Sequence, residues 1–429
     1  MPTSKLSTKR VGIIGTGFIS RGFARLISRC SDLRVSKVLT RRSKEDIAYP
    51  APELLSNSLD EVLRDSDILF ECSGDVVYGT LLVHEALRSG MPVVTMNSEL
   101  QVTTGSFLCG QGYLTEAEGD QPGSLAALSQ NAKAMGFKPI VYGNIKGFLN
   151  HTPTFEDMTY WSRKNGISLK QVTSFTDGTK IQIEQALVAN GLGAEISREG
   201  LEGYRCDTLS GGSDYLAGIA AAKKCPISDY LLASSLPPGV FVVAEHDAEQ
   251  SESLRYLKLG NGPYYTLMQP FHLCHLEVAK TVRRALMGDA PLLTNSPRPR
   301  FSVSAVAKRD LQPGERIPCG IGSFEVRGVA VRISDRPNHV PIGLMANAVV
   351  TREIRQGELI SFDDVELPKS LALTAYLSSR SQALAAFNQG KQVSKRNRLP
   401  HGITAPLLPQ GSDGQSILPL MNVELTRAR

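Results

Sequence analysis

The 429-residue sequence predicts an α/β fold, with a parallel sheet at the N-terminus, an α+β segment after it and a small β-rich part beyond. Three observations lead to this prediction. Short apolar strands alternate with helical segments over residues 1–100, which is typical of βαβ units. Mixed strand and helix patterns follow up to residue 300. A motif that reads as a strand, a glycine turn and a second strand then occurs twice.

The N-terminal unit consists of short apolar runs and of segments whose apolar residues recur at helical spacing. Because parallel strands need crossover connections, this alternation indicates one doubly wound sheet. Its strands are expected at residues 11–17, 33–39, 67–72 and 92–96, and its helices at residues 18–28 and 81–88.

The middle segment carries both patterns and ends at a proline-containing linker, Asn295–Arg300. A strand is expected at residues 139–142, after a helix that starts near Ser124, and further helices are expected at residues 181–189 and 273–287.

Beyond the linker, residues 307–317 and 350–360 share the order apolar, Arg, acid, apolar, Gly-Glu and Ile. Each copy is expected to form a strand, a tight glycine turn and a return strand. Two copies are too few for a solenoid, so we expect a small β domain. The chain becomes polar after Ala386, which favours a flexible tail. The predicted organisation is three domains, residues 1–145, 146–299 and 300–372, and a tail, residues 386–429.

Composition excludes several classes of protein. Hydrophobic residues make up 41% and charged residues 21%, which is ordinary for a soluble globular protein. Much of the net charge of +5 comes from basic residues past position 390, so the folded body lacks the excess charge of a nucleic-acid-binding domain. No apolar run reaches the ~20 residues that cross a bilayer, and the N-terminus lacks a secretion signal. The 7 cysteines are scattered, which favours reduced thiols and a cytoplasmic location.

A glycine-rich loop indicates a cofactor. Residues 15–22 (GTGFISRG) follow a predicted strand and open a helix, which is the placement of the dinucleotide-binding loop in Rossmann folds. Gly15 permits the tight turn, Gly17 lets the backbone approach a pyrophosphate, and Ser20 is small enough for close helix–strand packing. Free N–H groups at the helix start suit phosphate oxygens. The residues expected at the cofactor phosphates are Gly15, Thr16, Gly17, Phe18 and Ile19.

The end of the second predicted strand indicates which cofactor binds. Folds that bind NAD carry an acid there for the ribose 2′-OH, whereas this chain has Thr40, Arg41, Arg42 and Ser43, with no carboxylate before Glu45. Arginine pairs with a 2′-phosphate through two parallel hydrogen bonds. Arg41 and Arg42 therefore favour NADPH. Alternatively, they belong to a solvated loop.

Polar residues follow the third and fourth predicted strands, at the edge of the sheet where ligands bind. Ser73 and Gly74 come after the third strand, and Asn97 and Glu99 after the fourth. We expect all four to contact the cofactor, with Asn97 and Glu99 near the nicotinamide. Alternatively, Asn97 or Glu99 caps a helix.

Three strings, GIIGTGFISRG, FECSG and VVTMNSEL, together resemble the homoserine dehydrogenase-like NAD(P) oxidoreductases. The strings at 113–123 (YLTEAEGDQPG), 143–147 (GNIKG) and 177–193 (DGTKIQIEQALVANGLG) are similar to one branch of that family. This branch carries a C-terminal SAF domain, which the repeat resembles. It includes the DRL enzymes, the 1-deoxy-D-xylulose 5-phosphate reductoisomerase-like proteins of isoprenoid precursor synthesis. The resemblance covers about residues 10–370.

The resemblance implies an NADPH-dependent oxidoreductase that forms a homo-oligomer, a dimer or a tetramer, and acts on a small polar substrate with or without a phosphate group. Its most specific form implies conversion of 1-deoxy-D-xylulose 5-phosphate to 2-C-methyl-D-erythritol 4-phosphate, with Mg²⁺ or Mn²⁺ chelating the hydroxyketone. Two alternatives stay open, a plain dehydrogenase or reductase of a sugar acid or hydroxy acid, and a binding protein that senses NADPH without catalysis.

Two departures from better-known relatives mean that the catalytic residues cannot simply be carried over. Homoserine dehydrogenases usually place a catalytic lysine directly after the asparagine that follows the fourth strand, and Asn97-Ser98-Glu99 lacks it. Reductoisomerases carry an Asp-Ser-Glu-His metal motif, and this sequence has no such string.

Three acids lie close together in the sequence, Glu116, Glu118 and Asp120. Crowded carboxylates raise one another's pKa or bind a divalent cation through hard oxygens. We therefore expect Glu116 to act in catalysis and Glu118 and Asp120 to ligate a metal. Alternatively, the three belong to a solvated turn before a helix, whose dipole they complement.

Two lysines and an aspartate are further catalytic candidates. Lys146 lies between two glycines, which allow a ligand to approach closely, and its ammonium group polarises a carbonyl or holds a phosphate. Asp177 and Lys180 open a helix on which Lys180 and Glu184 share one face. Such a lysine–carboxylate pair moves the proton that accompanies hydride transfer. Alternatively, it is an exposed ion pair. The family resemblance favours a catalytic role for Lys146, Asp177 and Lys180.

Two histidines and two tyrosines complete the candidates. His272 and His275 are expected three residues apart on the helix predicted after position 272. Two ligands without a defined third are a weak sign of a metal site, so we expect one histidine to face the pocket and the other to pack. Tyr264 and Tyr265 are expected to line that pocket or to close a hairpin.

Overall fold

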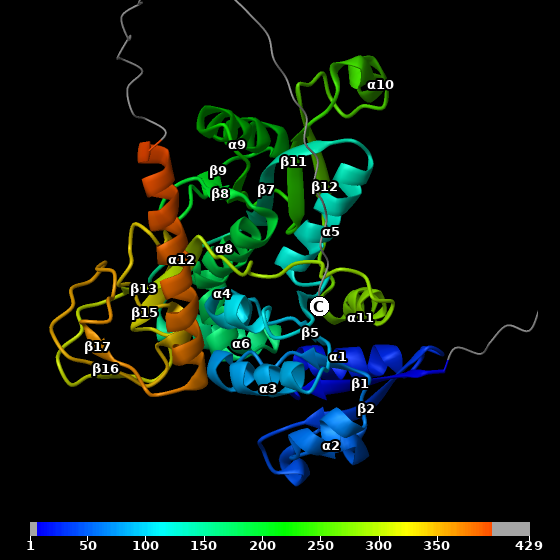
Figure 1. Cartoon of the computed structure of the whole chain (residues 1–429), viewed down its shortest axis with the longest axis vertical. Coiled ribbons are helices and arrows are strands. Elements are labelled where there is room, and N and C mark those ends of the chain that lie inside the picture. The colour runs from blue at the N-terminus through cyan, green and yellow to red at the C-terminus, as the bar shows by residue number, and fades with distance from the viewer. Residues whose placement is uncertain (1–6, 397–429) are drawn as a thin grey trace, which may run out of the picture. The chain divides into compact units, whose positions relative to one another are not determined.

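The computed structural model of the protein describes residues 7–396, with side chains up to residue 389. Its N-terminal part is a 6-stranded parallel sheet in the order β3-β2-β1-β4-β5-β6 (Figure 1). The strand order reverses between β1 and β4, where ligands bind in open α/β sheets. The strands are β1 (Lys9–Ile14), β2 (Leu33–Leu39), β3 (Leu55–Ser56), β4 (Ile68–Glu71), β5 (Val93–Thr95) and β6 (Leu114–Glu116).

Helices cover both faces of this sheet, which is why its central strands are apolar almost throughout. Phe23 and Ile27 of α1 pack on one face beside Val278 of α11, and Leu82 and Leu100 pack on the other face from α3 and α4. The helices are α1 (Phe18–Ile27), α2 (Leu59–Arg64), α3 (Val76–Arg88), α4 (Ser98–Leu108) and α11 (Val278–Leu286).

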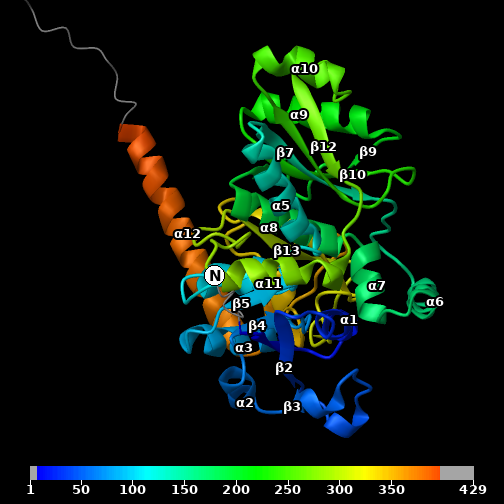
Figure 2. The same ribbon diagram turned by 90° about the vertical axis from the view of Figure 1, so that its right-hand side faces the viewer.

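The middle part is a mixed sheet in the order β12-β11-β7-β10-β8, with β9 pairing with β10 (Figure 2). α5 and α8 pack on one face and α9 on the other. The strands are β7 (Lys138–Lys146), β8 (Glu195–Ile196), β9 (Tyr204–Arg205), β10 (Ile227–Leu232), β11 (Val240–Glu245) and β12 (Tyr264–Gln269). The helices are α5 (Gln121–Ala134), α6 (Phe155–Asn165), α7 (Leu169–Thr176), α8 (Thr179–Leu192), α9 (Leu209–Lys223) and α10 (Ser251–Tyr256).

Helix α8 is the centre of the packing, and residues 179–190 are all buried. It contacts α4 of the first part, α5 and β10 of the second, and the strands of the β-rich part. Because its surroundings leave little room for water, its polar side chains are hydrogen-bonded inside the protein. Gln182, for example, donates to Gly200 O and accepts from Ala330 N. A helix buried on all sides can therefore place charged side chains between the parts of the molecule.

The β-rich part contains the antiparallel pair β13 (Phe301–Ala307) and β15 (Val326–Arg332), and the short strands β14 (Arg316–Ile317), β16 (Ala348–Val350) and β17 (Val365–Glu366). The two copies of the sequence repeat pair with each other. Leu311 and Ile354 exchange backbone hydrogen bonds of 2.8 and 3.0 Å. Gly314 and Gly357 take the same left-handed turn, with φ of 87° and 86°. The repeat is therefore structural, although its second copy ends in isolated bridges instead of a regular return strand.

Three element predictions need correction. The helix predicted at 273–287 is broken, because a short 3-10 turn at Cys274–Leu276 precedes α11. The helix predicted at 81–88 begins earlier, at Val76, where Asp75 caps it. Helix α12 (Leu371–Arg396) was not predicted at all, and its last residues occupy the start of the predicted tail. The rest of that tail lies outside the described residues.

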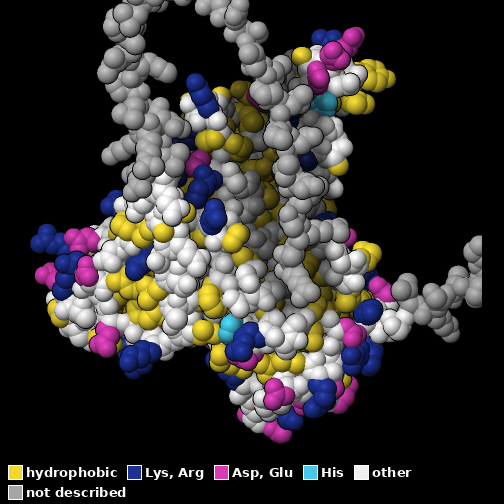
Figure 3. Space-filling view, viewed as in Figure 1, with side chains coloured by type: hydrophobic (Ala, Val, Ile, Leu, Met, Phe, Trp, Pro, Cys, Tyr) yellow, Lys and Arg dark blue, Asp and Glu magenta, His cyan; other side chains and the backbone are white. Residues whose placement is uncertain are grey.

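Other sequence expectations concern the surface and the thiols. All 7 cysteines lie within the described residues as free thiols. None of the helices in the described part of the chain combines the length and apolarity that a bilayer span requires. On the face drawn in Figure 3, basic and acidic side chains intermingle over the described residues.

Candidate active site

The glycine loop between β1 and α1 has the geometry expected of a phosphate-binding turn. Gly15 has φ of 112°, and a side chain there would meet Cys72 O at 3.0 Å, so only glycine fits. Gly17 faces open space, and no side chain caps the start of α1. Ser20 is fully buried and hydrogen-bonded to Tyr49 Oη at 2.8 Å. The loop therefore leaves the N–H groups of Phe18 and Ile19 facing the space above the sheet.

Both predicted arginines lie beside this loop. Arg42 donates to Thr16 Oγ1 at 2.8 Å, which places its guanidinium over the glycine loop. Arg41 pairs with Asp75 at 2.8 Å and lies over the ring of Tyr78, 4.1 Å from its centroid. The two arginines thus flank the end of β2, where the 2′ position of a bound dinucleotide lies in this fold.

Glu71, which sequence reasoning did not single out, organises the edge of the sheet. It is fully buried and accepts hydrogen bonds from Ser73 N and Oγ, at 2.8 and 2.5 Å, and from Thr95 Oγ1 at 2.7 Å. Burial raises its pKa. Asn97 Nδ2 donates to it at 3.4 Å, while Asn97 Oδ1 caps α4 by accepting from Leu100 N. One carboxyl group therefore holds the loops after β4 and β5 together, and Asn97 is a helix cap.

Gly74, the other residue predicted after the third strand, has φ of 65° and faces open space. The loop at this position therefore turns sharply and leaves room above the sheet.

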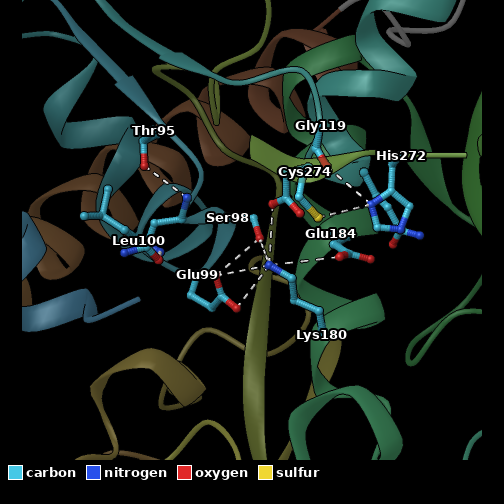
Figure 4. Close-up of polar contacts among 12 residues, drawn as sticks. Thr95, Ser98, Glu99, Leu100, Gly119, Lys180, Glu184, His272 and Cys274 are labelled. Carbon is cyan, nitrogen blue, oxygen red and sulfur yellow. Dashed lines mark hydrogen bonds and ion pairs between the residues drawn. The ribbon is translucent and has the colours of Figure 1, made fainter. Parts of the chain in front are cut away.

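Lys180 is the centre of a buried charge cluster that joins the two sheets (Figure 4). Its side chain is 10% exposed, and Nζ lies 2.6 Å from Ser98 Oγ, 3.2 Å from Glu99 and 3.5 Å from Asp120. Ser98 and Glu99 begin α4 directly after β5. Glu99, expected at the nicotinamide, therefore also fixes a lysine from the middle part. An ammonium group has three hydrogens, and these three partners account for them.

The carboxylates around Lys180 keep its side chain protonated. Burial alone would lower its pKa, but the carboxylates of Asp120, Glu99 and Glu184 outweigh burial and raise the pKa. Lys180 therefore stays an ammonium group at neutral pH. In return, its charge overcomes the burial of Asp120 and lowers the pKa of that carboxyl.

Glu116 belongs to the same cluster, but its pKa is shifted in the opposite direction from that of Asp120. It is fully buried, and within residues 7–389 no N–H or hydroxyl group donates to either carboxyl oxygen, so its neighbour is the carboxyl group of Asp120. Desolvation, and then the negative charge of Asp120, raises its pKa well above the ordinary value. Burial therefore favours the protonated form of Glu116, whereas the charge of Lys180 favours the carboxylate form of Asp120.

Lys146 ends β7 and belongs to a second, linked set of contacts. Its Nζ donates to Gln121 Oε1 at 2.6 Å and to Glu184 at 3.2 Å. Asn144, two residues earlier on the same strand face, donates to the same two acceptors at 2.7 and 3.1 Å. Glu184 also lies 4.0 Å from Lys180 and so connects the two lysines. The Lys146 side chain is 21% exposed, and residues 7–389 supply no third partner for its ammonium group.

The predicted metal ligands do not converge. Glu118 pairs with Lys280 at 2.9 Å, whereas Asp120 faces Lys180. No group of three His, Cys, Asp or Glu side chains within residues 7–389 is arranged to hold a metal ion. A lysine ammonium is the cation that lies among these acids. The donor set therefore does not fit a divalent cation.

Asp177 does not join the Lys180 cluster. It pairs with Lys308 of the β-rich part at 2.6 Å, and both side chains are almost completely buried, at 0% and 3% exposure. It also accepts from Thr179 N at the start of α8. This ion pair ties the turn between α7 and α8 to the β-rich part, and the catalytic role of Asp177 stays a prediction.

The two histidines separate as expected, although neither lies on a regular α-helix. His272 Nδ1 lies 3.3 Å from the carbonyl oxygen of Gly119, the residue that directly precedes Asp120. His275 packs against Gly22 and Phe18 of α1. One histidine therefore faces the cluster and the other packs.

Tyr264 and Tyr265 pack on opposite faces of the middle sheet, in separate apolar clusters, and do not line the lysine site.

The sequence analysis did not propose four residues of the site: Glu71, Ser98, Gln121 and Asn144. Asn144 and Lys146 are two apart on a strand and so share a face, which is a signal the sequence contains. Ser98 and Gln121 offer no such signal, because their contacts depend on how the two sheets dock.

Comparisons with known proteins agree with this geometry. Residues 15–108 match the family model for the NAD-binding domain of homoserine dehydrogenase, and residues 119–278 match the model for the catalytic domain of oxidoreductase DRL. No curated protein is similar to the chain by sequence. The two family matches end at residue 278, so the SAF-like character of residues 300–372 stays a prediction.

Three solved structures illustrate the similarity. A hyperthermophilic archaeal homoserine dehydrogenase in complex with NADPH is 14% identical, with a TM-score of 0.41, and the match covers 66% of this chain and 99% of that chain. UDP-N-acetylglucosamine 3-dehydrogenase from Acidithiobacillus ferrooxidans is 12% identical, with a TM-score of 0.39 and coverage of 67% and 92%. A dehydrogenase from Clostridium difficile is 12% identical, with a TM-score of 0.38 and coverage of 67% and 94%.

Both family models describe oxidoreductases, and the two matched ranges contain the two halves of the site. The glycine loop, Ser98 and Glu99 lie in the first range, and Lys146 and Lys180 lie in the second. The chain is therefore an NAD(P)-dependent oxidoreductase, in which residues 15–108 are similar to the NAD-binding domain of homoserine dehydrogenase and residues 119–278 to the catalytic domain of oxidoreductase DRL.

Proposed function

We propose that the protein uses NADPH to reduce a carbonyl group of a small polar substrate, with a lysine and not a metal ion polarising that carbonyl. The observation that carries this proposal is the linked pair of lysines. Lys180 donates a hydrogen bond to Ser98, which begins α4 directly after β5. Lys146 forms an ion pair with Glu184, and one N–H of its ammonium group has no partner within residues 7–389. The pair lies at the carboxyl edge of the cofactor sheet, where the nicotinamide belongs in this fold.

NADPH is the proposed form of the cofactor because of the end of β2. The chain has no carboxylate there to bind a ribose 2′-OH, and Arg42 already lies over the glycine loop. A 2′-phosphate would replace Thr16 and Asp75 as partner of Arg42 and Arg41, and both arginines are exposed enough to turn toward it. Bound NADPH would supply the hydride.

The two lysines have different proposed roles. The three hydrogens of Lys180 are taken up by Ser98, Glu99 and Asp120, so this lysine fixes the geometry and supplies positive potential. Lys146 is more exposed and has two partners, so its third N–H is available to the substrate oxygen. A hydrogen bond from an ammonium group stabilises the negative charge that develops on that oxygen as hydride adds to the carbon.

The proton that completes the reduction has a source within the cluster. Glu116 is buried beside Asp120, which contacts Lys180, and its raised pKa favours the protonated form. A carboxyl group that holds a proton near the reacting oxygen can act as a general acid and is protonated again from solvent after each turnover. We assign to Glu116 the role of this general acid.

A second candidate function is the rearrangement named by the family resemblance, conversion of 1-deoxy-D-xylulose 5-phosphate to 2-C-methyl-D-erythritol 4-phosphate. The match of residues 119–278 to the DRL catalytic domain favours it. Mg²⁺ or Mn²⁺, which was predicted for that reaction, finds no fitting ligand set here. If the protein carries out this rearrangement, we expect Lys146 to hold the substrate oxygen.

One experiment separates these functions. Protein treated with EDTA is mixed with NADPH and 1-deoxy-D-xylulose 5-phosphate, or with a panel of small hydroxyketones and hydroxyaldehydes. NADPH oxidation is followed by absorbance, and the product is identified by mass spectrometry and NMR. Turnover in EDTA supports a lysine-polarised carbonyl. Turnover that EDTA abolishes and Mn²⁺ restores contradicts it, and a branched product identifies the rearrangement.

A further inference from the structure

A groove runs along the outer face of α1, away from the lysine site. It has a volume of about 600 Å³ and lies between α1, the segment before β3 and the turn at Cys274–Leu276. We call it the α1 groove and define it by Phe18, Arg21, Arg25, Arg29, Tyr49 and Leu276. A groove of this size accommodates a small metabolite.

The charged side chains that line the α1 groove are all arginines. Arg21 and Arg25 lie four residues apart on one face of α1, and Arg29 follows in the turn after the helix, so all three line one side of the groove. No carboxylate lines the groove, and none forms an ion pair with these three side chains within residues 7–389. Elsewhere on this surface arginines do find acids, as Arg283 does with Asp32. Three unpaired guanidinium groups in one groove match a ligand with several negative charges.

The rest of the groove is apolar. Phe18 and Leu276 are 56% and 50% exposed, which is unusual for side chains of their size, and Tyr49 and Pro50 face them. Tyr49 is 7% exposed and its hydroxyl group is bonded to Ser20, so its side chain forms part of the groove wall and offers no free polar group. His275 packs edge-on to Phe18 and closes one end. The groove therefore offers charge on one side and an apolar floor on the other.

The α1 groove is separate from the proposed cofactor site. Of the residues assigned to the cofactor, it shares Phe18 alone, and Gly15, Gly17, Arg41 and Arg42 do not line it. It follows α1 toward the C-terminal end of that helix, whereas the cofactor phosphates belong at the N-terminal end.

We propose that the α1 groove binds a small organic polyanion, a molecule with two or more phosphate groups attached to an apolar or aromatic body. The three arginines hold the phosphates, and the body covers Leu276 and Tyr49. Nothing in the proposed reaction requires this ligand, so the site is additional to the cofactor and substrate sites.

Calorimetric titration of the full chain with one equivalent of NADPH tests this proposal, because the cofactor site is then filled and no excess of NADPH, itself a phosphorylated aromatic molecule, competes for the groove. The probes are inorganic tripolyphosphate, which carries charge alone, and ATP without metal, which adds an aromatic body. We expect both to bind, with ATP the tighter. Arg25→Ala and Arg29→Ala should each weaken both probes about tenfold, the value of a charge-assisted hydrogen bond. Arg88→Ala, an exposed arginine on α3, is the matched control and should change neither affinity.

Leu276→Ser tests the apolar side of the groove separately from the arginines that hold the phosphates. It should weaken ATP and leave tripolyphosphate unchanged. Equal affinity of the two probes, with no effect of Leu276→Ser, would show that the ligand needs no apolar or aromatic body. Binding that survives Arg25→Ala and Arg29→Ala would place the anion elsewhere.

An absence of binding, together with a dimer in sedimentation velocity that these variants dissociate, would make the groove an interface between copies. Failure of NADPH to bind would overturn the proposed function, and the same titrations without NADPH would still test the groove.

Discussion

The ammonium group of Lys146 lies 3.2 Å from the carboxylate of Glu184, and this contact connects the end of a strand to the central helix of the molecule. Glu184 is 3% exposed and is the carboxylate that pairs with Lys146 within residues 7–389; it also lies 4.0 Å from Lys180, which Glu99 and Asp120 approach more closely. A buried charge that loses its partner is costly, because water cannot replace the lost interaction.

Glu184→Gln should therefore destabilise the protein by about 3 kcal/mol, since the amide cannot balance either ammonium group. Chemical denaturation of the purified variant measures this loss. A double-mutant cycle with Lys180→Met is the control, and the double variant should lose less stability than the sum of the two single variants. Additive losses would show that Glu184 and Lys180 do not interact.

Arg41 and Arg42 should determine the choice of cofactor. Arg41→Ala combined with Arg42→Ala should weaken NADPH by at least about tenfold, because charge-assisted contacts to the 2′-phosphate are lost. The affinity for NADH should change much less, since NADH has no phosphate there. Fluorescence titration with both dinucleotides measures the ratio, with Arg88→Ala as control. Equal losses for the two cofactors would refute the assignment.

Asp177→Asn should affect stability and not the cofactor. Asp177 and Lys308 form a buried ion pair between the turn before α8 and the β-rich part, and breaking such a pair costs about 3 kcal/mol. We expect a lower free energy of unfolding and an NADPH affinity equal to that of the unaltered protein. A stable variant that has lost only turnover would support the catalytic role predicted from the sequence.

His339 should make stability depend on pH. It is buried, bonded to Tyr376 Oη at 2.8 Å, and burial lowers its pKa from 6.5 to about 4. The unfolded chain then binds a proton that the folded protein excludes, so this contribution is complete above pH 6.5 and is lost as the pH falls toward 4. Between pH 7.5 and pH 5 the loss is about 2 kcal/mol. In denaturation at both pH values, His339→Gln should remove this part of the difference, and an unchanged difference would argue against it.

The sequence predicted the part of the fold that local patterns determine. Four of the six strands of the first sheet (all but β3 and β6), the glycine loop and the central helix carrying Lys180 and Glu184 follow from apolar spacing and from turn residues. The reason is that a strand or helix covered on known faces must show that burial in its own sequence.

What the sequence did not predict depends on docking between distant segments. Asp177 was grouped with Lys180 because the two are close in sequence, but Asp177 lies in the turn between α7 and α8 while Lys180 lies on α8, so they face different neighbours. Glu118 and Asp120 also diverge, because Lys280 of α11 draws one away and Lys180 draws the other. Gln121 and Ser98 became visible as site residues only once the two sheets were placed together.

The most direct test of the account is the turnover number of Lys146→Ala with NADPH and the substrate found in the EDTA experiment. We predict that kcat falls by about 10²–10³, the usual contribution of a group that stabilises a developing oxyanion, while the Kd of NADPH is unchanged. Lys138→Ala, an exposed lysine at the other end of the same strand, should leave both constants unaltered. A Lys146→Ala variant that folds, binds NADPH and keeps its full kcat would contradict the central claim.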